Sequence, residues 1–385
     1  MNILIVIRWP VGGIQTYCKY IYGLPEFDQW KFTVITTTEA DEEYFLGAFG
    51  TRLNGLFRFG DAEFSAGAIL RIARRMPRPE LIHAHGFSSA VFAIPTRVLL
   101  GIPLLLTSHD ILQDSQFRGI PGVMKKAALA AALRLSARVN VVGNDAGENL
   151  RSYFPRTCSP AKLSVILNGI DGERFAEEAR RDVRSELGLA KNVLLLGFFG
   201  RFMAQKGFKY VLDMLGKHGE NLRAPVHVAC FGWGGFIREE QAEITRRGLS
   251  EHFSFLPATN EMPAALRGCD AVIMPSLWEA MPLLAMEALV AGVPLIASAC
   301  IGLREVCEGS PAVMCAPGDS GSLLDAVNRF VSERAHHEAE ARRYQDAAKL
   351  KFDRRQTALR LRALYDATAR RESGAERPLT GSAGR

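Results

Sequence analysis

Two carboxylates, Glu279 and Glu287, stand out because they are eight residues apart and follow an apolar run that predicts a buried strand. Glu287 is the only charged side chain between Pro282 and Leu295, a stretch that predicts a helix followed by a turn. A helix that is apolar on all sides belongs in an interior, where a carboxylate needs a partner or a ligand. Glu287 therefore either caps a loop or pairs with a structural Arg, or it binds a ligand.

Two cations, Arg201 and Lys206, lie in the segment GRFMAQKG, between a predicted strand at 193–199 and a helix that begins at Phe208. An Arg side chain binds phosphate oxygens as a fork and a Lys acts as a point charge, so this pair suits a diphosphate. Two surface cations beside a turn are the alternative. The carboxylates further along the chain favour the ligand interpretation.

The first half of the chain carries weaker candidates after two of its predicted strands. Gly12 and Gly13 follow the apolar run 2–7, and such a loop lets backbone approach a phosphate, although a plain tight turn gives the same pattern. His109 follows the apolar run 103–106, at the expected edge of a sheet. A lone His at such a place often has only a structural role.

His83 and His85 share one face of a predicted strand, as two metal ligands would. No third ligand has a recognisable spacing. We therefore favour hydrogen-bonded histidines at the end of a strand over a metal site.

The elements that must position these residues alternate between strand and helix. Predicted strands lie at 2–7, 32–36, 81–84, 104–107, 139–142 and 163–167, and then at 193–199, 226–231, 253–256, 271–274 and 295–297. This alternation predicts an α/β chain with doubly wound parallel sheets, which bind ligands beyond the carboxyl ends of their strands. A charged stretch, 173–186, separates the halves and places the domain boundary after residue 172. Helix is expected from 318 to about 371, and a disordered tail at 372–385.

The composition fits an ordinary globular chain with two cores, since 48% of the 385 residues are hydrophobic and 23% are charged. The net charge of +6 permits attraction to phosphate, but no nucleic-acid-binding module is recognisable. The seven Cys include no CxxC pair, no run of eighteen apolar residues occurs, and the first residues lack a basic segment. We therefore expect a cytoplasmic protein with reduced thiols.

A basic amphipathic stretch, 118–138, predicts a helix with Lys and Arg set among Ala, Leu, Val and Met. Such a helix either packs on a core with a solvated rim, the commoner outcome, or lies on an anionic membrane.

The motifs PVGG, TSHD, NGID, GRFMAQKG and EAMPLLAME followed by AGVPLIAS occur in one order along the chain. In this order the sequence resembles the retaining nucleotide-sugar enzymes of glycosyltransferase family 4, from Met1 to about Arg370. The resemblance implies the GT-B fold, with two Rossmann-like domains facing across a cleft. Residues 1–172 would form the acceptor-side domain and 173–352 the donor domain, and a helix at about 353–371 would pack back on the first domain.

The resemblance also implies a role for each candidate residue. Arg201 and Lys206 would hold the donor diphosphate, Glu287 the ribose and Glu279 the hydroxyls of the transferred sugar. The backbone N–H groups of Leu283 and Leu284 and the loop Gly12–Gly13 would also contact the diphosphate. His109 would face the donor sugar, and the backbone near Leu256 to Ala258 would contact the base. The implied catalytic residues are His109, Glu279, Arg201 and Lys206, without a metal or another cofactor.

The implied reaction transfers a hexose from a UDP- or GDP-sugar to a carbohydrate or lipid-linked acceptor, with retention, in polysaccharide or glycoconjugate biosynthesis. The enzyme would be cytoplasmic or peripheral on the cytoplasmic face of the inner membrane, through 118–138, and would not bind nucleic acid. Acceptor contacts are expected in loops such as 37–61. The turn Ala280-Met281-Pro282 departs from the Glu-Gly-x-Gly of many family members, which leaves two alternatives: a catalytically silent nucleotide-sugar-binding scaffold, or a nucleotide-sugar epimerase.

Overall fold

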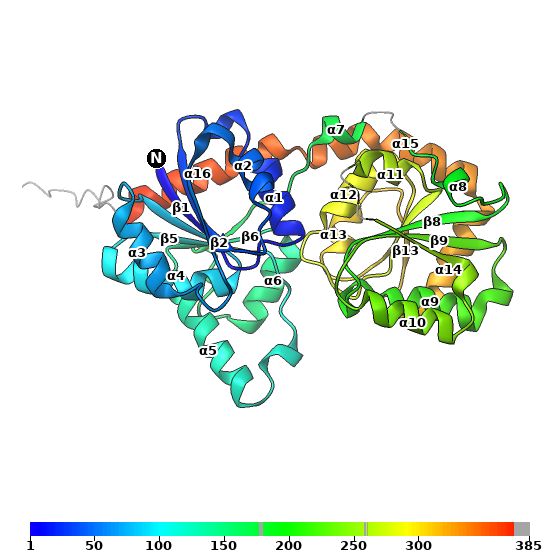
Figure 1. The fold of residues 1–385 in the computed structure, drawn as a ribbon, viewed down its shortest axis with the longest axis horizontal. Coiled ribbons are helices and arrows are strands. Elements are labelled where there is room, and N and C mark those ends of the chain that lie inside the picture. The colour runs from blue at the N-terminus through cyan, green and yellow to red at the C-terminus, as the bar shows by residue number, and fades with distance from the viewer. Residues whose placement is uncertain (177–179, 258, 260, 373–385) are drawn as a thin grey trace, which may run out of the picture. The chain divides into compact units, whose positions relative to one another are not determined.

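The chain folds into two compact units in this computed structural model, which describes residues 1–176, 180–257, 259 and 261–372. Unit 1 comprises residues 1–142, 147–167 and the chain from 355 onward. Unit 2 comprises residues 143–146 and 168–354. Each unit is built on its own parallel sheet (Figure 1).

The sheet of unit 1 has seven strands in the order β3-β2-β1-β4-β5-β6-β7. Its central strands are short and mostly apolar, and they are buried on both faces, as parallel strands covered by helices must be. The strand bounds are β1 Asn2–Ile7, β2 Lys31–Thr37, β3 Leu53–Phe59, β4 Leu81–His85, β5 Leu104–Ser108, β6 Arg138–Val141 and β7 Leu163–Val165.

The helices of unit 1 cover both faces of this sheet (Figure 1). One face carries α1 (Gly13–Ile21), α2 (Glu42–Phe49) and the last helix of the chain, α16 (Arg354–Glu372). The other face carries α3 (Ala66–Arg75), α4 (Phe87–Leu100) and α5 (Gly119–Leu135), and α6 (Asn144–Tyr153) follows β6.

The sheet of unit 2 has six strands in the order β10-β9-β8-β11-β12-β13. All of its pairings are parallel, and Phe199, Phe231 and Leu256 lie side by side at the carboxyl ends of β8, β9 and β10. The strand bounds are β8 Leu194–Phe199, β9 Val226–Phe231, β10 Phe253–Leu256, β11 Ala271–Met274, β12 Leu295–Ser298 and β13 Val313–Cys315.

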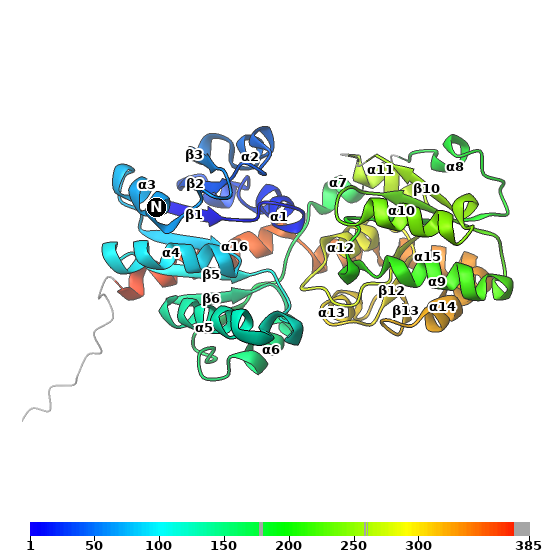
Figure 2. The ribbon, with the colours of Figure 1, turned by 60° about the horizontal axis from the view of Figure 1, so that its bottom comes forward.

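The helices of unit 2 form two layers around its sheet. Figure 2 brings α9 (Phe208–His218), α10 (Ile237–Arg246) and α14 (Ser320–Ser332) to the front of that unit. The remaining helices are α7 (Gly172–Ala176), α8 (Val183–Glu186), α11 (Met262–Arg267), α12 (Leu283–Val290), α13 (Leu303–Cys307) and α15 (Arg334–Lys351). Short 3₁₀ turns connect several elements of the two units, at 25–27, 50–52, 114–117, 204–206, 219–221 and 250–252.

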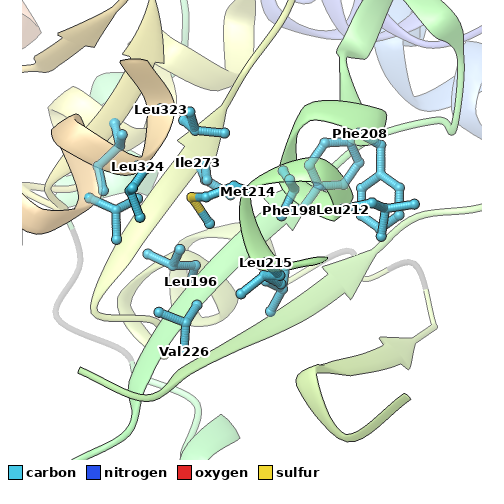
Figure 3. Packing of buried hydrophobic residues seen from close by; sticks show 14 of the residues in the cluster. Leu196, Phe198, Phe208, Leu212, Met214, Leu215, Val226, Ile273, Leu323 and Leu324 are labelled. Carbon is cyan, nitrogen blue, oxygen red and sulfur yellow. The ribbon is translucent and has the colours of Figure 1, made fainter. Parts of the chain in front are cut away.

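Packing between α9, α14 and the sheet forms the core of unit 2 (Figure 3). Leu196 and Phe198 of β8 and Ile273 of β11 contribute from the sheet, and Phe208 and Leu323 from the two helices. Each fully buried side chain of this size contributes about 1.5–3 kcal/mol of transfer free energy. This core holds β8 and β11 side by side, and with them the loops that follow both strands.

Both sheets share the strand order of the doubly wound fold, in which the first strand of a sheet lies next to its fourth. The order reverses between β1 and β4 in unit 1 and between β8 and β11 in unit 2. Loops on the two sides of such a reversal diverge and leave room for a ligand beyond the carboxyl ends of the strands.

The structure differs from what the sequence predicts at four places. The segment 37–61 is not mainly loop, since it forms α2 and the edge strand β3. A further edge strand, β13, precedes the region that was expected to be helical from 318. The helix expected over 118–138 ends at Leu135, because Arg138 already pairs with Leu105 as the first residue of β6. The predicted tail begins at the last residue of α16, and 373–385 lie outside the described residues.

Candidate functional site

The loops after β8 and β11 are joined at the point where the strand order of unit 2 reverses. The backbone N–H of Leu277 donates to the carbonyl oxygen of Gln205 at 2.8 Å. Gly207 has a positive φ of 68°, and a Cβ at this position would lie 1.9 Å from the carbonyl oxygen of Pro275. Only glycine therefore fits where the two loops meet.

Glu279 is the centre of a polar cluster between these loops. Its side chain is buried, with the residue only 5% exposed. Lys206 Nζ lies 2.7 Å from Glu279 Oε1, and the hydroxyl of Ser276 donates to the same oxygen at 2.8 Å. Gln205 Nε2 donates to the carbonyl oxygen of Trp278 at 2.8 Å and approaches Glu279 Oε2 at 3.4 Å. The carboxylate is thereby held in one orientation.

Gln205 and Ser276 were missed by the sequence prediction. Their only signal is position, since Gln205 precedes Lys206 and Ser276 lies three residues before Glu279.

Arg201 follows β8 by two residues and is half-buried. Within the part of the chain that the structure describes, its guanidinium has no hydrogen-bond or ion-pair partner. A planar donor of five N–H groups at the end of a strand is suited to phosphate oxygens.

The turn Ala280-Met281-Pro282 leads directly into α12. Among the described residues no non-glycine residue has a positive φ, so the loss of the family's glycines causes no backbone strain here. Asn168 Nδ2 donates to the carbonyl oxygen of Met281 at 3.0 Å, which anchors the turn. Pro282 is the N-cap of α12, with extended backbone.

The N-terminus of α12 presents its first backbone N–H groups, at Leu283 and Leu284, without a side-chain cap among the described residues. Uncapped N–H groups and the helix dipole favour an anion at this end. Glu287 lies one turn further along and is buried, with 6% of the residue exposed. The helix is otherwise apolar, as the sequence predicts.

Leu256, the predicted base-binding position, is the last residue of β10 and is half-buried. Its strand lies two places from β8 at the same sheet edge. Ala258, the other end of the predicted base-binding segment, lies outside the described residues.

Unit 1 contains the other predicted site residues. Gly12 is the N-cap of α1, with a positive φ of 60°, so the turn requires glycine. Gly13 is exposed, and a Cβ placed on it would meet no atom of the described chain within 4 Å. Nothing in the fold of unit 1 therefore requires Gly at position 13.

His109 lies one residue beyond β5, and its Nε2 is 2.9 Å from Nδ1 of His85. Its ring also packs edge-on against Tyr17, with 5.3 Å between ring centroids. Burial lowers the pKa of His109 to about 4, so the imidazole is neutral near pH 7. A neutral imidazole can accept or donate one hydrogen bond on the nitrogen that faces away from His85.

Behind His109, a buried network connects four elements of unit 1. The Tyr22 hydroxyl lies 2.7 Å from His85 Nε2 and 3.0 Å from the hydroxyl of Tyr365 on α16. His83 bridges the Tyr365 hydroxyl at 2.5 Å and the Thr107 hydroxyl at 2.7 Å. The ring nitrogens of His83 and His85 thus have tyrosine, threonine and histidine partners, which is the interpretation that the sequence favours over a metal site.

Asn144 and Asp145 also follow a strand; they belong to unit 2 and have structural partners within that unit. Glu305 accepts hydrogen bonds from both of their backbone N–H groups, at 2.8 and 2.9 Å. Asp145 in turn accepts from Arg304 and from the N–H of Gly302, and the hydrogen bond from Arg304 holds the pKa of Asp145 below its ordinary value. These contacts leave Asp145 without a role as an acid.

The structure thus gathers the predicted residues in two groups. Arg201, Lys206, Glu279 and the start of α12 surround the reversal point of unit 2, and Glu287 lies one helical turn behind them. Gly12, Gly13 and His109 lie at the carboxyl edge of the sheet in unit 1. The unit 2 group combines two cations, a helix N-terminus and two carboxylates, a set suited to a diphosphate linked to hydroxyl-bearing groups.

Comparisons with known proteins identify the family of the chain. Residues 11–174 match the family model Glycosyltransferase Family 4, and residues 179–350 match the model Glycosyl transferases group 1. The 2-deoxystreptamine N-acetyl-D-glucosaminyltransferase of Streptomyces fradiae is 29% identical over 279 residues, which cover 69% of this chain and 65% of that enzyme. The UDP-Gal:alpha-D-GlcNAc-diphosphoundecaprenol alpha-1,3-galactosyltransferase of Escherichia coli is 28% identical over 225 residues, 57% of each chain. The matches therefore leave a third or more of both relatives' length uncovered.

Among solved structures, Anabaena HepE in complex with UDP-glucose superimposes with a TM-score of 0.79 at 22% identity. The superposition covers 95% of this chain and 100% of that one. At this identity the likeness shows the fold, which is that of two Rossmann-like α/β units. With both halves matched by glycosyltransferase family models and the fold shared, the chain belongs to the GT-B glycosyltransferases, of the family 4 type.

Proposed function

We propose that the protein is a retaining glycosyltransferase that transfers a hexose from a nucleoside diphosphate sugar to a carbohydrate or lipid-linked acceptor, in polysaccharide or glycoconjugate biosynthesis. The observation that carries this proposal is the cluster at the reversal point of unit 2. There Lys206 pairs with the buried Glu279, Arg201 has no partner within the described chain, and the start of α12 has no side-chain cap.

In the proposed mechanism, Arg201 and Lys206 bind the donor diphosphate together with the N–H groups of Leu283 and Leu284. Negative charge develops on the departing diphosphate, and cations aimed at that charge lower the barrier most when they are already in place. The diphosphate oxygen assists deprotonation of the acceptor hydroxyl. This scheme draws its positive charge from side chains and backbone, so we propose that transfer needs no metal or other cofactor.

The two carboxylates would recognise different hydroxyl groups of the donor. When the diphosphate takes over Lys206, the Glu279 oxygens become available to hydroxyls of the transferred sugar. Glu287 would accept hydrogen bonds from the ribose. From unit 1, Gly13 would approach the diphosphate and neutral His109 would donate to or accept from the donor sugar.

The donor that we propose to test first is a UDP-sugar, with GDP-sugars second. The name of the E. coli relative includes UDP-Gal, and HepE was crystallised with UDP-glucose. Purified protein should transfer or slowly hydrolyse sugar from at least one of these donors. A folded sample that acts on no UDP-, GDP- or ADP-sugar would contradict the proposed function. If the donor alone is converted to a different nucleotide sugar, the protein is an epimerase instead.

Glu287→Gln is the sharpest single test of the ribose contact, because Gln keeps the shape of the side chain and removes its charge. A charged hydrogen bond contributes about 1.5–3 kcal/mol, so nucleotide affinity should fall about 10- to 150-fold. Glu239→Gln, on the exposed first turn of α10, is the matched control and should bind normally. Equal affinity of Glu287→Gln and wild type would remove the ribose role.

We also propose that the first two turns of α5 attach the protein to an anionic membrane surface. Ile120, Val123 and Met124 share one side of the helix and are 78%, 64% and 68% exposed, with the exposed Lys125 and Lys126 beside them. In its later turns the same helix buries Leu129, Ala132 and Leu133. The part of the chain that the structure describes holds no helix long and apolar enough to span a bilayer.

Sedimentation with vesicles of phosphatidylcholine, with and without phosphatidylglycerol, tests this attachment. Each basic residue near an anionic surface contributes about 1 kcal/mol, so Lys125→Gln with Lys126→Gln should weaken binding about 30-fold. Leu350→Ala, at an exposed site of unit 2, should bind like wild type. If the protein binds equally to vesicles with and without phosphatidylglycerol, or to neither, the proposed attachment is wrong. A cytoplasmic location is part of it, since all seven Cys are buried free thiols.

A further inference from the structure

The loop between β9 and α10, Gly232 to Phe236, carries two aromatic side chains that the fold does not bury. Trp233 is 57% exposed and Phe236 is 54% exposed. Within the described chain the Trp233 ring stacks on no other aromatic ring and accepts no cation. An exposed aromatic ring offers a π face on which another ring can stack.

The backbone of this loop is bonded to the segment that carries Arg201. The N–H of Phe236 donates to the carbonyl oxygen of Phe202 at 2.6 Å, and Gly235 forms a β-bridge with Phe202. A Cβ on Gly232 would lie 1.9 Å from the carbonyl oxygen of Gly200. The backbone on both sides of Trp233 is therefore held beside the Arg201 segment.

The register of the sheet gives the position of Trp233 along the edge. Phe199, Phe231 and Leu256 end their strands at the same level, with β9 between β8 and β10. Trp233 follows Phe231 by two residues, just as Arg201 follows Phe199 by two. It therefore comes between the strand that leads to the diphosphate cations and the strand predicted to lead to the base. In doubly wound sheets, ligands bind beyond the carboxyl ends of the strands, at the edge where Trp233 lies.

We propose that Trp233 is the stacking platform for the nucleobase of the donor. This inference rests on the proposed function, because it takes the Arg201 and Lys206 cluster as the diphosphate site. Stacking is tolerant of base identity, since each base has a π face, so Trp233 supplies affinity for the nucleoside part without choosing uracil or guanine. The choice of base is left to the backbone beyond β10.

The test measures binding of UDP, GDP, ADP and inorganic pyrophosphate to the full-length chain by calorimetry. Stacking of one base on an aromatic side chain corresponds to an affinity change of about 5- to 150-fold. Trp233→Ala should weaken binding of the preferred nucleoside diphosphate by that factor and leave pyrophosphate affinity unchanged. Trp233→Phe should retain most of the affinity, because a ring remains. Leu350→Ala, 81% exposed on α15, is the surface control and should match wild type.

The outcomes separate this inference from the function on which it rests. Wild type that binds no nucleoside diphosphate would overturn both. Wild type that binds, together with Trp233→Ala that binds equally well, would overturn only the stacking role. A Trp233→Ala variant with normal nucleotide affinity and a raised KM for the acceptor would assign the ring to the acceptor sugar instead and would likewise overturn the proposal. Nucleotide-induced quenching of tryptophan fluorescence that disappears in Trp233→Phe would support it independently.

Discussion

At the scale of single residues, the pairing of Lys206 with Glu279 is the feature with the clearest consequence. The carboxylate is buried, and within the described chain its side-chain partners are Lys206, Ser276 and Gln205. A buried carboxylate that loses its cation is left with an uncompensated charge. The pair therefore holds both groups in place and couples the stability of unit 2 to them.

Lys206→Met should lower the free energy of unfolding by about 1–3 kcal/mol, because Glu279 loses its charged partner. The double variant with Glu279→Gln should regain most of that stability, since no buried charge remains, while transfer activity stays lost in both variants. Chemical denaturation and a donor-turnover assay measure the two effects, and Lys209→Met, exposed on α9, is the control. Additive losses in the double variant would contradict the pairing.

The sequence locates these residues but does not pair them. Arg201, Lys206 and Glu279 could be predicted because each follows an apolar strand, where ligand-binding side chains collect. The contact between Lys206 and Glu279 joins positions 73 residues apart, and the Tyr22–Tyr365 hydrogen bond joins positions 343 apart. No local sequence pattern indicates contacts between residues so far apart in the chain, which is why neither tyrosine was a candidate.

At the scale of elements, the buried central strands were predictable and some edge strands were not. β11 is an unbroken apolar run, and β1 and β9 are apolar apart from Asn2 and His227; the predicted bounds of all three match the observed ones. β3 and β13 lie at the edges of their sheets. β3 contains Asn54, Gly55 and Arg58, because one side of an edge strand meets solvent, and β13 has only three residues. Both therefore lack the apolar signal that identifies a central strand.

The loops after β1 and β8 each contain a glycine, Gly13 and Gly207, that follows a buried strand. The two glycines differ in how much space a side chain would have at each position. Gly207→Ala should destabilise the protein by more than about 2 kcal/mol, since φ is positive and the new Cβ would clash with the Pro275 carbonyl. Gly13→Ala should leave stability unchanged or raise it by up to about 1 kcal/mol, because it lies at the start of α1 in open space.

Donor binding separates the roles of these two glycines. If the diphosphate approaches Gly13, then Gly13→Ala should raise the KM for the donor severalfold in a protein of normal thermal stability. A normal KM would remove Gly13 from the site. A Gly207→Ala variant as stable as wild type would show that the loops after β8 and β11 can separate without cost.

At the scale of the whole molecule, the two units should respond differently to acid. Burial holds the pKa of His83 and His85 well below the ordinary value, and that of His109 at about 4. In unit 2, burial also lowers the pKa of His227 and His337. There the Glu251 carbonyl and the Glu333 carboxylate favour the protonated rings and offset part of that shift. Acid sensitivity from neutral histidines is therefore concentrated in unit 1.

The direction of the effect follows from proton uptake by the unfolded chain. Above a pH of about 6.5 both the folded and the unfolded forms of these histidines are neutral, and stability is fully present. As the pH falls from about 6.5 toward 4, these histidines bind protons in the unfolded chain but stay neutral in the folded chain. Unit 1 then loses up to about 1.4 kcal/mol per pH unit for each such histidine.

Native-state hydrogen exchange measures this loss when it is corrected for the intrinsic exchange rate. The protection is compared between two sets of strands, β1, β4 and β5 in unit 1 and β8, β9 and β11 in unit 2. Unit 1 strands should lose more protection than unit 2 strands between pH 7 and pH 5.5. An equal loss in both units would mean that the Tyr22–His85 network takes up protons without opening, and the neutral state of His109 would have to be abandoned with it.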